Sequence, residues 1–447
     1  MMNRLIILGI IVVQIGLTAA LSWSDAPRSA ASSEPKQSAL EEVQWGGHLR
    51  ALGSVTMLDD QARTLWGKNS NLIDGYGAFR LNNDLFFNSG WQFQAHYEAF
   101  TAIGDTVEAT GILREQFPEI PAADLGSAMV IDDDRRLMDL TRIIEDDRRH
   151  LIYHRLDRLN LALTRPWGMI RLGRQALTWG NGLVFHPMDL FNPFSPTAIT
   201  KDYKTGDDMA MAQVPVESTG DLQILYVPRR HPVNRDLKWD QSSLAGKYHQ
   251  STERIEMDVM AAYHFEDIVI GIGATGTVRD AAWRLDMTWT FPDEHSDTGS
   301  YLSAVANIDY AWTWWEKNVY GLIEFYFNGL GENNNPAVSQ NTALVTRLER
   351  ADLFVTGRAY LAGEIQIEAH PLVRIDLGAI YNLGDLSGLL QPRLVWDVVT
   401  NWQLITGIRW YFGGRTTEFG GDDVQMTDHT ISFSPPDTAY LQVTRFF

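Results

Sequence analysis

The chain has 447 residues, a formal net charge of -19 and no cysteine, so disulfides, thiol catalysis and cysteine-ligated metal sites are excluded. The acidic balance argues against a nucleic-acid partner, because phosphates attract lysine and arginine. The mean hydropathy of -0.18 excludes a bundle of transmembrane helices. Aromatic residues reach 11%, which suits either a membrane interface or an aromatic-rich secreted all-β protein.

The N-terminus has the order of an export signal. A short positive segment is followed by an apolar core from Leu5 to Leu17 and then by small residues. This order predicts a secretory signal peptide over residues 1–22, with cleavage after Ala20 or Ser22. Residues 23–44 are rich in alanine, serine and proline, and we expect them to form a flexible periplasmic lead-in.

From Trp45 onward apolar and polar residues alternate, which is the pattern of strands with two unlike faces. The alternation is clearest in 91–100, 283–291 and 360–369. By itself it fits a β-sandwich equally well. The expected strands lie near 45–56, 76–87, 90–101, 151–164, 167–176, 207–216, 219–227, 242–250, 254–265, 268–276, 280–291, 300–313, 317–328, 357–369, 371–383, 388–399, 401–413 and 438–447.

The lengths of the connections decide between a sandwich and a barrel. The joints after every second strand are turn-sized, whereas most of the intervening joints are long, such as 102–150. Short periplasmic turns that alternate with long external loops are typical of outer-membrane barrels. We therefore predict an all-β chain in which residues 45–447 form a single closed antiparallel transmembrane β-barrel of about 16–18 strands in the bacterial outer membrane. Two short external joints, 266–267 and 384–387, leave the strand number open by two.

The chain ends within a strand, at Phe447. In this feature it resembles outer-membrane proteins broadly, whose last strand ends in Phe and is read by the barrel assembly machinery. The resemblance implies that this machinery binds the chain through Phe447, and that outer-membrane lipid and lipopolysaccharide surround it. Arg445 departs from the pattern, because that position is usually hydrophobic or aromatic.

The 102–150 connection contains a second pattern. Leu137, Leu140, Ile143 and Ile144 have helical spacing between two acidic runs, which predicts a short amphipathic helix. Carboxylate runs are also the ligands of Ca²⁺, but the EF-hand pattern is absent and arginines stand beside the acids. A solvated, self-paired helix is the favoured interpretation.

The segment 177–206 differs from every other connection. Glycine and proline break any regular strand there, yet the segment is too apolar for a free external loop. The available place for such a segment in a barrel is the lumen. We expect it to fold inward as the third external loop and to narrow a channel; alternatively, it only seals and stiffens the barrel.

The same region resembles porin-like outer-membrane families, including alginate-export-type barrels and related uncharacterised ones. Those families carry Arg-x-Gly-Arg-Gln at the end of a strand, then Trp-Gly, then a loop with Asn-Pro. Here the motif reads Arg171-Leu172-Gly173-Arg174-Gln175, Trp179-Gly180 and Asn192-Pro193. The resemblance implies a porin-like protein and leaves the solute open.

Charges of both signs fall on the strand face opposite the apolar one, where they either line a water-filled lumen or pair across neighbouring strands. Arg174 has the opposite strand parity to Arg171, which favours a place at the rim. The candidate pore-lining residues are Arg80, Arg158, Arg171 and Arg174 on the electropositive side, Glu98, Asp189 and Asp207 opposite them, and Trp179 and Asn192 at the constriction.

The predicted function is a channel for diffusion or export of small hydrophilic or anionic solutes, without a cofactor or a catalytic site. One alternative is a barrel that sheathes a periplasmic or exported partner; an open lumen would favour it. The other is an outer-membrane hydrolase, which needs a nucleophile beside a poised histidine. The histidines stand outside any Gly-x-Ser-x-Gly context, so we expect no enzyme. The oligomeric state is left open.

Overall fold

The computed structural model describes residues 40–58, 63, 71–116, 133–197, 203–294, 296–333, 335–425, 430–433 and 435–447. The barrel unit spans Leu40–Phe447. The expected signal peptide 1–22 and most of the lead-in fall outside the described residues. Residues 40–44 are an exception: they were expected in the lead-in but belong to the first strand, because the second strand is long enough to pair with them.

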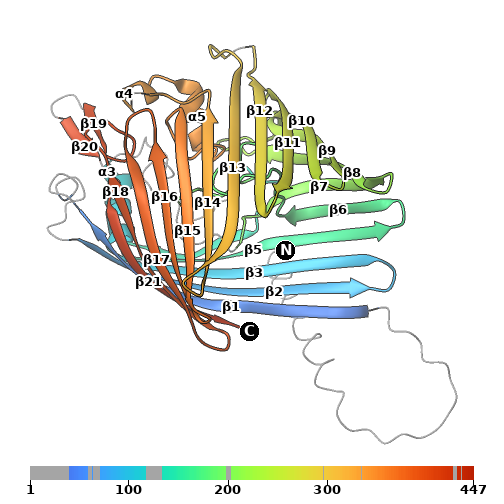
Figure 1. Cartoon of the computed structure of the whole chain (residues 1–447), viewed down its shortest axis with the longest axis horizontal. Coiled ribbons are helices and arrows are strands. Elements are labelled where there is room, and N and C mark those ends of the chain that lie inside the picture. The colour runs from blue at the N-terminus through green and yellow to red at the C-terminus, as the bar shows by residue number, and fades with distance from the viewer. Residues whose placement is uncertain are drawn as a thin grey trace, which may run out of the picture. The chain divides into compact units, whose positions relative to one another are not determined.

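Eighteen strands form one closed antiparallel barrel (Figure 1), which confirms the expected fold at the upper end of the expected strand number. They are β1 (Leu40–Met57), β2 (Leu72–Phe87), β3 (Trp91–Gly104), β5 (His150–Arg165), β6 (Gly168–Gln175), β7 (Asp207–Val216), β8 (Gly220–Arg230), β9 (Leu237–Ser251), β10 (Ile255–His264), β11 (Asp267–Val278), β12 (Ala281–Phe291), β13 (Tyr301–Trp314), β14 (Lys317–Asn328), β15 (Ala359–His370), β16 (Val373–Asn382), β17 (Gly388–Val399), β18 (Trp402–Phe412) and β21 (Asp437–Phe446). The connections carry α3 (Asp105–Gln116), β4 (Thr141–Asp147), α4 (Asn335–Val338), α5 (Thr342–Glu349), β19 (Asp422–Gln425) and β20 (Thr430–Phe433).

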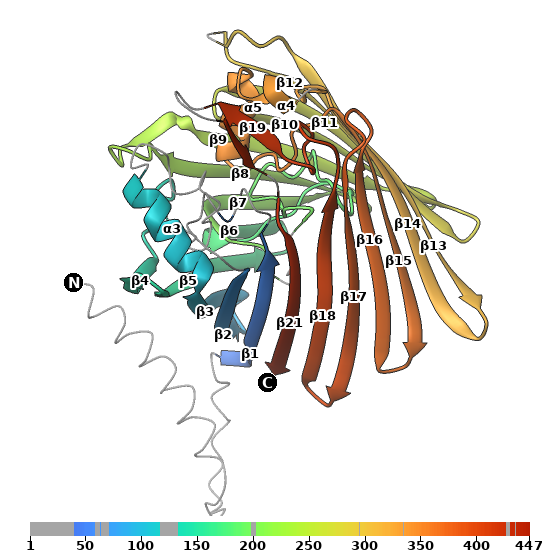
Figure 2. The same cartoon turned by 90° about the vertical axis from the view of Figure 1, so that its left-hand side faces the viewer.

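The barrel closes where the first strand meets the last (Figure 2). β1 pairs with β2 along one edge and with β21 along the other, from His48 opposite Phe446 to Met57 opposite Asp437. In lipid every backbone N–H and C=O must be paired within the protein, so this closure is what allows the sheet to span a membrane.

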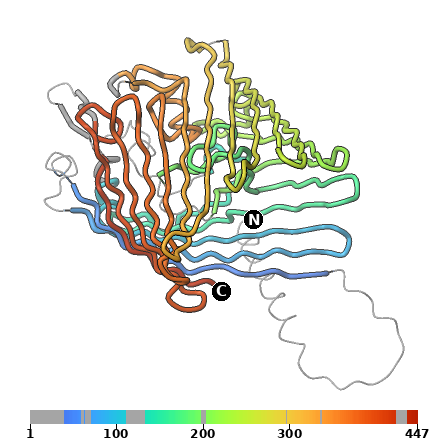
Figure 3. The backbone as a smooth tube through the Cα atoms, viewed as in Figure 1, coloured from blue at the N-terminus to red at the C-terminus, as the bar shows by residue number. Residues whose placement is uncertain are grey.

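Tight turns and wide connections alternate along the chain (Figure 3). Several of the tight turns contain non-glycine residues at positive φ, among them Glu217, Arg279, Trp315 and Asn401. The two short joints that left the expected strand number open by two, after β10 and after β16, are external loops. The expected strands on either side of each joint are therefore separate strands. The alternation confirms the short periplasmic turns and longer external loops.

The outer surface of the barrel is apolar. On β11, Ile268, Ile270 and Ile272 are about half exposed, whereas the intervening Val269 is buried on the inner face. Tryptophans cluster toward both ends of the strands, where one side of the ring meets lipid and the other meets polar headgroups. Trp91, Trp167, Trp314 and Trp402 lie at the turn end, and Trp239, Trp289 and Trp410 lie toward the loop end. These features place the protein in the bacterial outer membrane. Among the described residues, no helix is both long and apolar enough to cross a bilayer.

The helix expected around residues 137–144 is wrong. Thr141–Asp147 form the strand β4, which pairs with the upper part of β5, and the helix α3 comes earlier in the connection. The physical reason is that β6 has only 8 residues and pairs with β5 from Leu159 to Arg165, which leaves the rest of that β5 edge open. Pairing with an exposed strand edge satisfies the backbone of β4 and overrides the local spacing.

The closure of the barrel leads to a testable prediction at Gly47. Its N–H and C=O bond Phe447, and a Cβ added there would lie 2.0 Å from the carbonyl oxygen of Arg80. We expect Gly47→Ala to lower the free energy of unfolding by about 1–3 kcal/mol, because the clash is with backbone. Gly53→Ala is the matched control on the same strand, since its Cβ would meet nothing within 4 Å.

Urea unfolding of the refolded barrel, followed by tryptophan fluorescence, measures the difference. Equal midpoints for the two variants would show that the packing at Gly47 and Phe447 does not limit closure.

Candidate functional site: segment 177–206 and its contacts

The first part of the segment packs against the inner face of β7–β11. Trp179 is 1% exposed, lies edge-on to Phe191 at 5.6 Å between ring centroids, and donates from Nε1 to Gln223 Oε1 at 2.9 Å. Buried side chains from five strands and from the segment surround it. They are Met188, Met209, Met211, Leu225, Val227, Ala245, Met260, Ala262 and Val269.

The next five residues bond two carboxylates of the barrel wall. Asn181 N and Gly182 N donate to Asp286 Oδ2 at 2.5 and 3.1 Å, and the Asn181 side chain donates to Oδ1 at 2.8 Å. The next three N–H groups donate to Glu324. Leu183 N donates to Oε2 at 2.8 Å, and the N–H groups of residues 184 and 185 donate to Oε1 at 3.0 and 2.7 Å. Asp286 lies on β12, Glu324 lies on β14, and both are fully buried. We call these two residues the carboxylate pair.

Beyond the carboxylate pair the segment enters a second apolar cluster. The Phe185 ring stacks on Tyr326 at 4.5 Å and lies 5.5 Å from Tyr360. Val355 and Phe419, from the connections that follow β14 and β18, complete the cluster. Three connections therefore share one core with the inner face of β13–β17.

The two arms of the segment are joined by a buried ion pair. Lys204 Nζ lies 2.6 and 2.5 Å from the two carboxylate oxygens of Asp189, and it also donates to the carbonyl oxygen of Leu177. Burial raises the pKa of Asp189 to about 6, even though Lys204 acts in the opposite direction. Because the packed segment binds this proton more tightly than a solvated carboxyl does, mild acidification favours the packed state.

Tyr203, on the returning arm, is a residue that the sequence analysis missed. Its ring lies 4.0 Å from the Arg80 guanidinium and stacks on His48 at 5.5 Å, and the residue remains 40% exposed. Arg80 itself is 1% exposed, so Tyr203 covers it. A Tyr between two charged residues in a connection carries no pattern that would have singled it out.

Arg80 and Arg158 share one carboxylate. Arg80 Nη2 and Arg158 Nη1 each lie 2.6 Å from Asp157 Oδ2. Asp157 is the extra residue of a bulge in β5, and Asp157 and Arg158 are both buried as a result. Glu98 bonds Arg155 Nε at 2.7 Å beside them. Three of the predicted pore-lining residues are thus brought together in one cluster, in which Arg80, Arg155 and Arg158 face the two carboxylates of Asp157 and Glu98.

Arg174 has a different environment. Arg174 keeps the strand parity opposite to that of Arg171, because β6 pairs with β5 and β7 without a register shift, and it is buried with Nη1 2.8 Å from Asp133 and Nε 2.8 Å from Asp208. Its Nη2 donates to the carbonyl oxygen of Met138 at 2.6 Å. Arg174 therefore joins the ends of β6 and β7 to residues 133–147, which we call the wall patch.

The remaining predicted residues are dispersed. Asp207 pairs with Arg229 at 2.6 Å, and Asn192 adopts φ 54 within the segment. Arg171 points to the inner face of β6, where the carboxylate of Asp84 acts on it electrostatically; among the described residues it forms no salt bridge, and its guanidinium lies 3.6 Å from Met169 Sδ. Asp189 and Trp179 belong to the packing of the segment itself.

The comparisons agree with this architecture. Similar solved structures include OccAB2 of Acinetobacter baumannii, with a TM-score of 0.50 and 9% identity over 92% of this chain and 99% of that one. Others are a BenF-like porin from Pseudomonas fluorescens (TM-score 0.48, 8% identity, 92% and 99% covered) and Wzi of Escherichia coli, an outer-membrane protein described as a carbohydrate-binding β-barrel (0.48, 9%, 89% and 83%). At such identities the first likeness shows the fold alone. No family model matches the sequence, and no curated protein aligns with it.

The chain has the fold of porin-like outer-membrane β-barrels. The finer resemblance to alginate-export-type barrels stays a prediction.

One group of side chains in this porin-like barrel has the order of a hydrolytic triad. Ser243 Oγ lies 2.8 Å from His264 Nδ1, and His264 Nε2 lies 3.4 Å from Asp352 Oδ1. A nucleophile must reach its substrate, but Ser243 is fully buried and its oxygen also accepts from Arg229 at 3.0 Å. These residues hold the connection after β14 against β9 and β10.

Among the described residues, one group is spaced for a metal ion: Glu145, Asp147 and His150, all exposed where β4 turns into β5. Exposed acidic groups of this kind are common without an ion, so the group supports no metal assignment.

The ion pair of Asp189 and Lys204, which joins the two arms of segment 177–206, leads to a testable prediction. Lys204→Met leaves a buried carboxylate without its cation, and we expect a loss of about 3–5 kcal/mol in the free energy of unfolding. Asp189→Asn combined with Lys204→Met removes both charges and should recover a large part of that loss. Urea unfolding of the two single variants and the double variant gives the coupling free energy; strictly additive losses would contradict a coupled pair.

Proposed function

We propose that the porin-like barrel is a channel for small hydrophilic solutes, and that segment 177–206 narrows it. The observation that carries the proposal is the series of backbone N–H groups from residues 181–185 that bond the carboxylate pair. These bonds hold the segment against inward-facing residues of β12 and β14, across the interior from its origin at β6. Passage is by diffusion, and its direction follows the solute gradient.

We propose that solutes pass along β15–β17. There, inward-facing side chains stay accessible: Arg374 and Arg393 are 45% and 34% exposed, and Glu364 is 26% exposed. Around Trp179, by contrast, the inward-facing side chains of β7–β11 are buried. The segment therefore fills the β7–β11 side of the interior and packs at the loop ends of β13–β17, whereas the interior nearer the turn ends of β15–β17 stays polar and solvated.

We further propose a modest preference for anions, with Arg171 as its main source. Arg80, Arg158 and Arg174 are buried and bonded to carboxylates, so a passing solute does not contact them. Arg171 forms no salt bridge among the described residues, and Asp84 acts on it only at longer range. The proposed surroundings are outer-membrane lipid and lipopolysaccharide, with Phe447 as the contact for the assembly machinery.

A sheath for a periplasmic or exported partner is the alternative. A sheath needs an unobstructed interior, whereas here Trp179, Phe185 and the carboxylate pair commit much of the interior to the segment. The channel is therefore the better-supported function.

Loosening the segment should widen the channel. In Asp286→Asn with Glu324→Gln, each amide keeps one acceptor oxygen but places an NH₂ group where the second carboxylate oxygen accepted, so the segment loses part of its bonds to the wall. We expect single-channel conductance in planar bilayers to rise or to fluctuate between levels. Glu256→Gln is the matched control, because Glu256 lies on β10, is exposed and bonds no part of the segment.

Unchanged conductance in a double variant that still folds would contradict narrowing by the segment. Absence of conductance in both the wild type and the double variant would favour the sheath.

Arg171→Gln should shift the reversal potential toward cations. The expected change in the anion-to-cation permeability ratio is about twofold, the effect of a unit charge acting over about 10 Å of water. Arg254→Gln removes the same charge from an exposed periplasmic turn and should leave the ratio unchanged. Equal ratios in both variants would remove Arg171 from the proposed path.

A further inference from the structure

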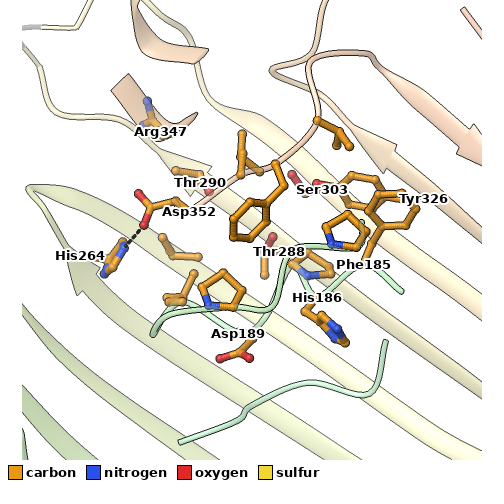
Figure 4. A pocket seen from close by; sticks show the side chains of 18 of the residues that line it. Phe185, His186, Asp189, His264, Thr288, Thr290, Ser303, Tyr326, Arg347 and Asp352 are labelled. Carbon is orange, nitrogen blue, oxygen red and sulfur yellow. Dashed lines mark hydrogen bonds and ion pairs between the residues drawn. The ribbon is translucent and has the colours of Figure 1, made fainter. Parts of the chain in front are cut away.

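We propose that the porin-like barrel binds a small neutral polyol in a cavity between segment 177–206, the connection after β14 and the wall of β10–β14 (Figure 4). The cavity has a volume of about 80 Å³. The proposal concerns binding and does not depend on whether the barrel conducts.

One side of the cavity is a wall of hydroxyl groups. Thr288 and Thr290 project from β12, and Ser303 projects from β13 directly opposite Thr288 in the strand register (Figure 4). Thr288 is 3% exposed, and in the described part of the chain its hydroxyl forms no hydrogen bond with a protein group. A buried hydroxyl without a protein partner favours a ligand that can both donate and accept a hydrogen bond.

The other side of the cavity is apolar. Phe185, Pro193 and Phe194 come from segment 177–206, and Leu353 and Phe354 come from the connection after β14. Opposed polar and apolar walls fit a molecule with hydroxyl groups along one face and C–H groups along the other. A polyol has that chemistry, whereas a fully apolar molecule would leave the Thr288 hydroxyl unpaired, since Thr290 and Ser303 already bond Tyr301 and Tyr326.

The charges at the margin of the cavity exclude an ion as the ligand. Arg347 pairs with Asp267, and His264 pairs with Asp352. Asp189, the other ionisable residue of the lining besides His186, is turned to Lys204. An ion entering the cavity would be desolvated without an available counter-charge, so a neutral ligand is favoured.

The volume limits the size of the ligand. A cavity needs about 10–15 Å³ for each water-sized group, so this one holds about five to eight such groups. Glycerol and erythritol, with three and four carbons, fall within that range. A six-carbon polyol such as sorbitol exceeds it.

Saturation-transfer NMR on the full folded chain in detergent micelles tests the proposal with glycerol, erythritol and sorbitol as probes. We expect transfer to glycerol and erythritol and none to sorbitol. Thr288→Val keeps the shape and removes the free hydroxyl, and it should reduce the transfer severalfold. Thr275→Val, an inward-facing change on β11 outside the cavity, is the control and should behave as the wild type.

Three results would overturn the proposal. Equal transfer to all three probes would mean unspecific contact, and no transfer at all would mean that the cavity holds water only. Retention of the full signal in Thr288→Val would remove the hydroxyl wall from the site. None of these results bears on conductance, so the proposed channel would stand or fall separately.

Discussion

The organisation of the interior depends on the bonds between the carboxylate pair and the backbone of residues 181–185. Burying a carboxylate inside a protein costs free energy unless hydrogen-bond donors surround it. Burying the N–H groups of a loop costs free energy unless each has a hydrogen-bond acceptor. Among the described residues neither Asp286 nor Glu324 has a salt-bridge partner; backbone N–H groups and the side chains of Asn181 and Asn307 take that role. The carboxylate pair and the backbone N–H groups of residues 181–185 therefore offset each other's desolvation. This explains how an irregular segment can be held inside a barrel.

Turning this segment inward has a consequence for the wall. The chain leaves β6 after 8 residues and returns only at β7, so both strands stop short of the external end of β5. The wall patch covers the gap: β4 pairs with β5, and Arg135 and Arg136 bond the end of β8. Arg174 ties the patch to both short strands. The inward segment and the wall patch are thus two parts of one arrangement, since the first creates the opening that the second fills.

The sequence predicts the barrel well, because strand alternation and loop asymmetry are local patterns imposed by lipid and water on every strand. It also predicts that segment 177–206 is unusual, because apolar residues among prolines are visible in one dimension. It fails where the outcome depends on distant partners. The spacing of Leu137 to Ile144 fits a helix. The sequence does not show that β5 has an open edge with which residues 141–147 can pair. Arg174 shows the same limit: its parity is the one that alternation assumes, but the residues of the wall patch that bury it, such as Asp133, are distant in the sequence. Glu324 carries a weak signal, a lone acid on an apolar strand, whereas Tyr203 carries none.

The pairing of interior charges changes how the sequence must be used to infer selectivity. Counting inward-facing arginines suggests an electropositive lumen, but Arg80 and Arg158 are buried and bonded to Asp157, so a passing solute does not contact them. The charges that a passing solute meets are those that remain solvated, chiefly Arg374, Arg393 and Glu364 along β15–β17. Glu364 on β15 is acidic, Arg374 on β16 and Arg393 on β17 are basic, and Asp376 bonds both arginines, so the two signs balance. A field of this kind orients polar solutes across the passage more than it attracts one sign, so any anion preference has to come from an unpaired cation such as Arg171.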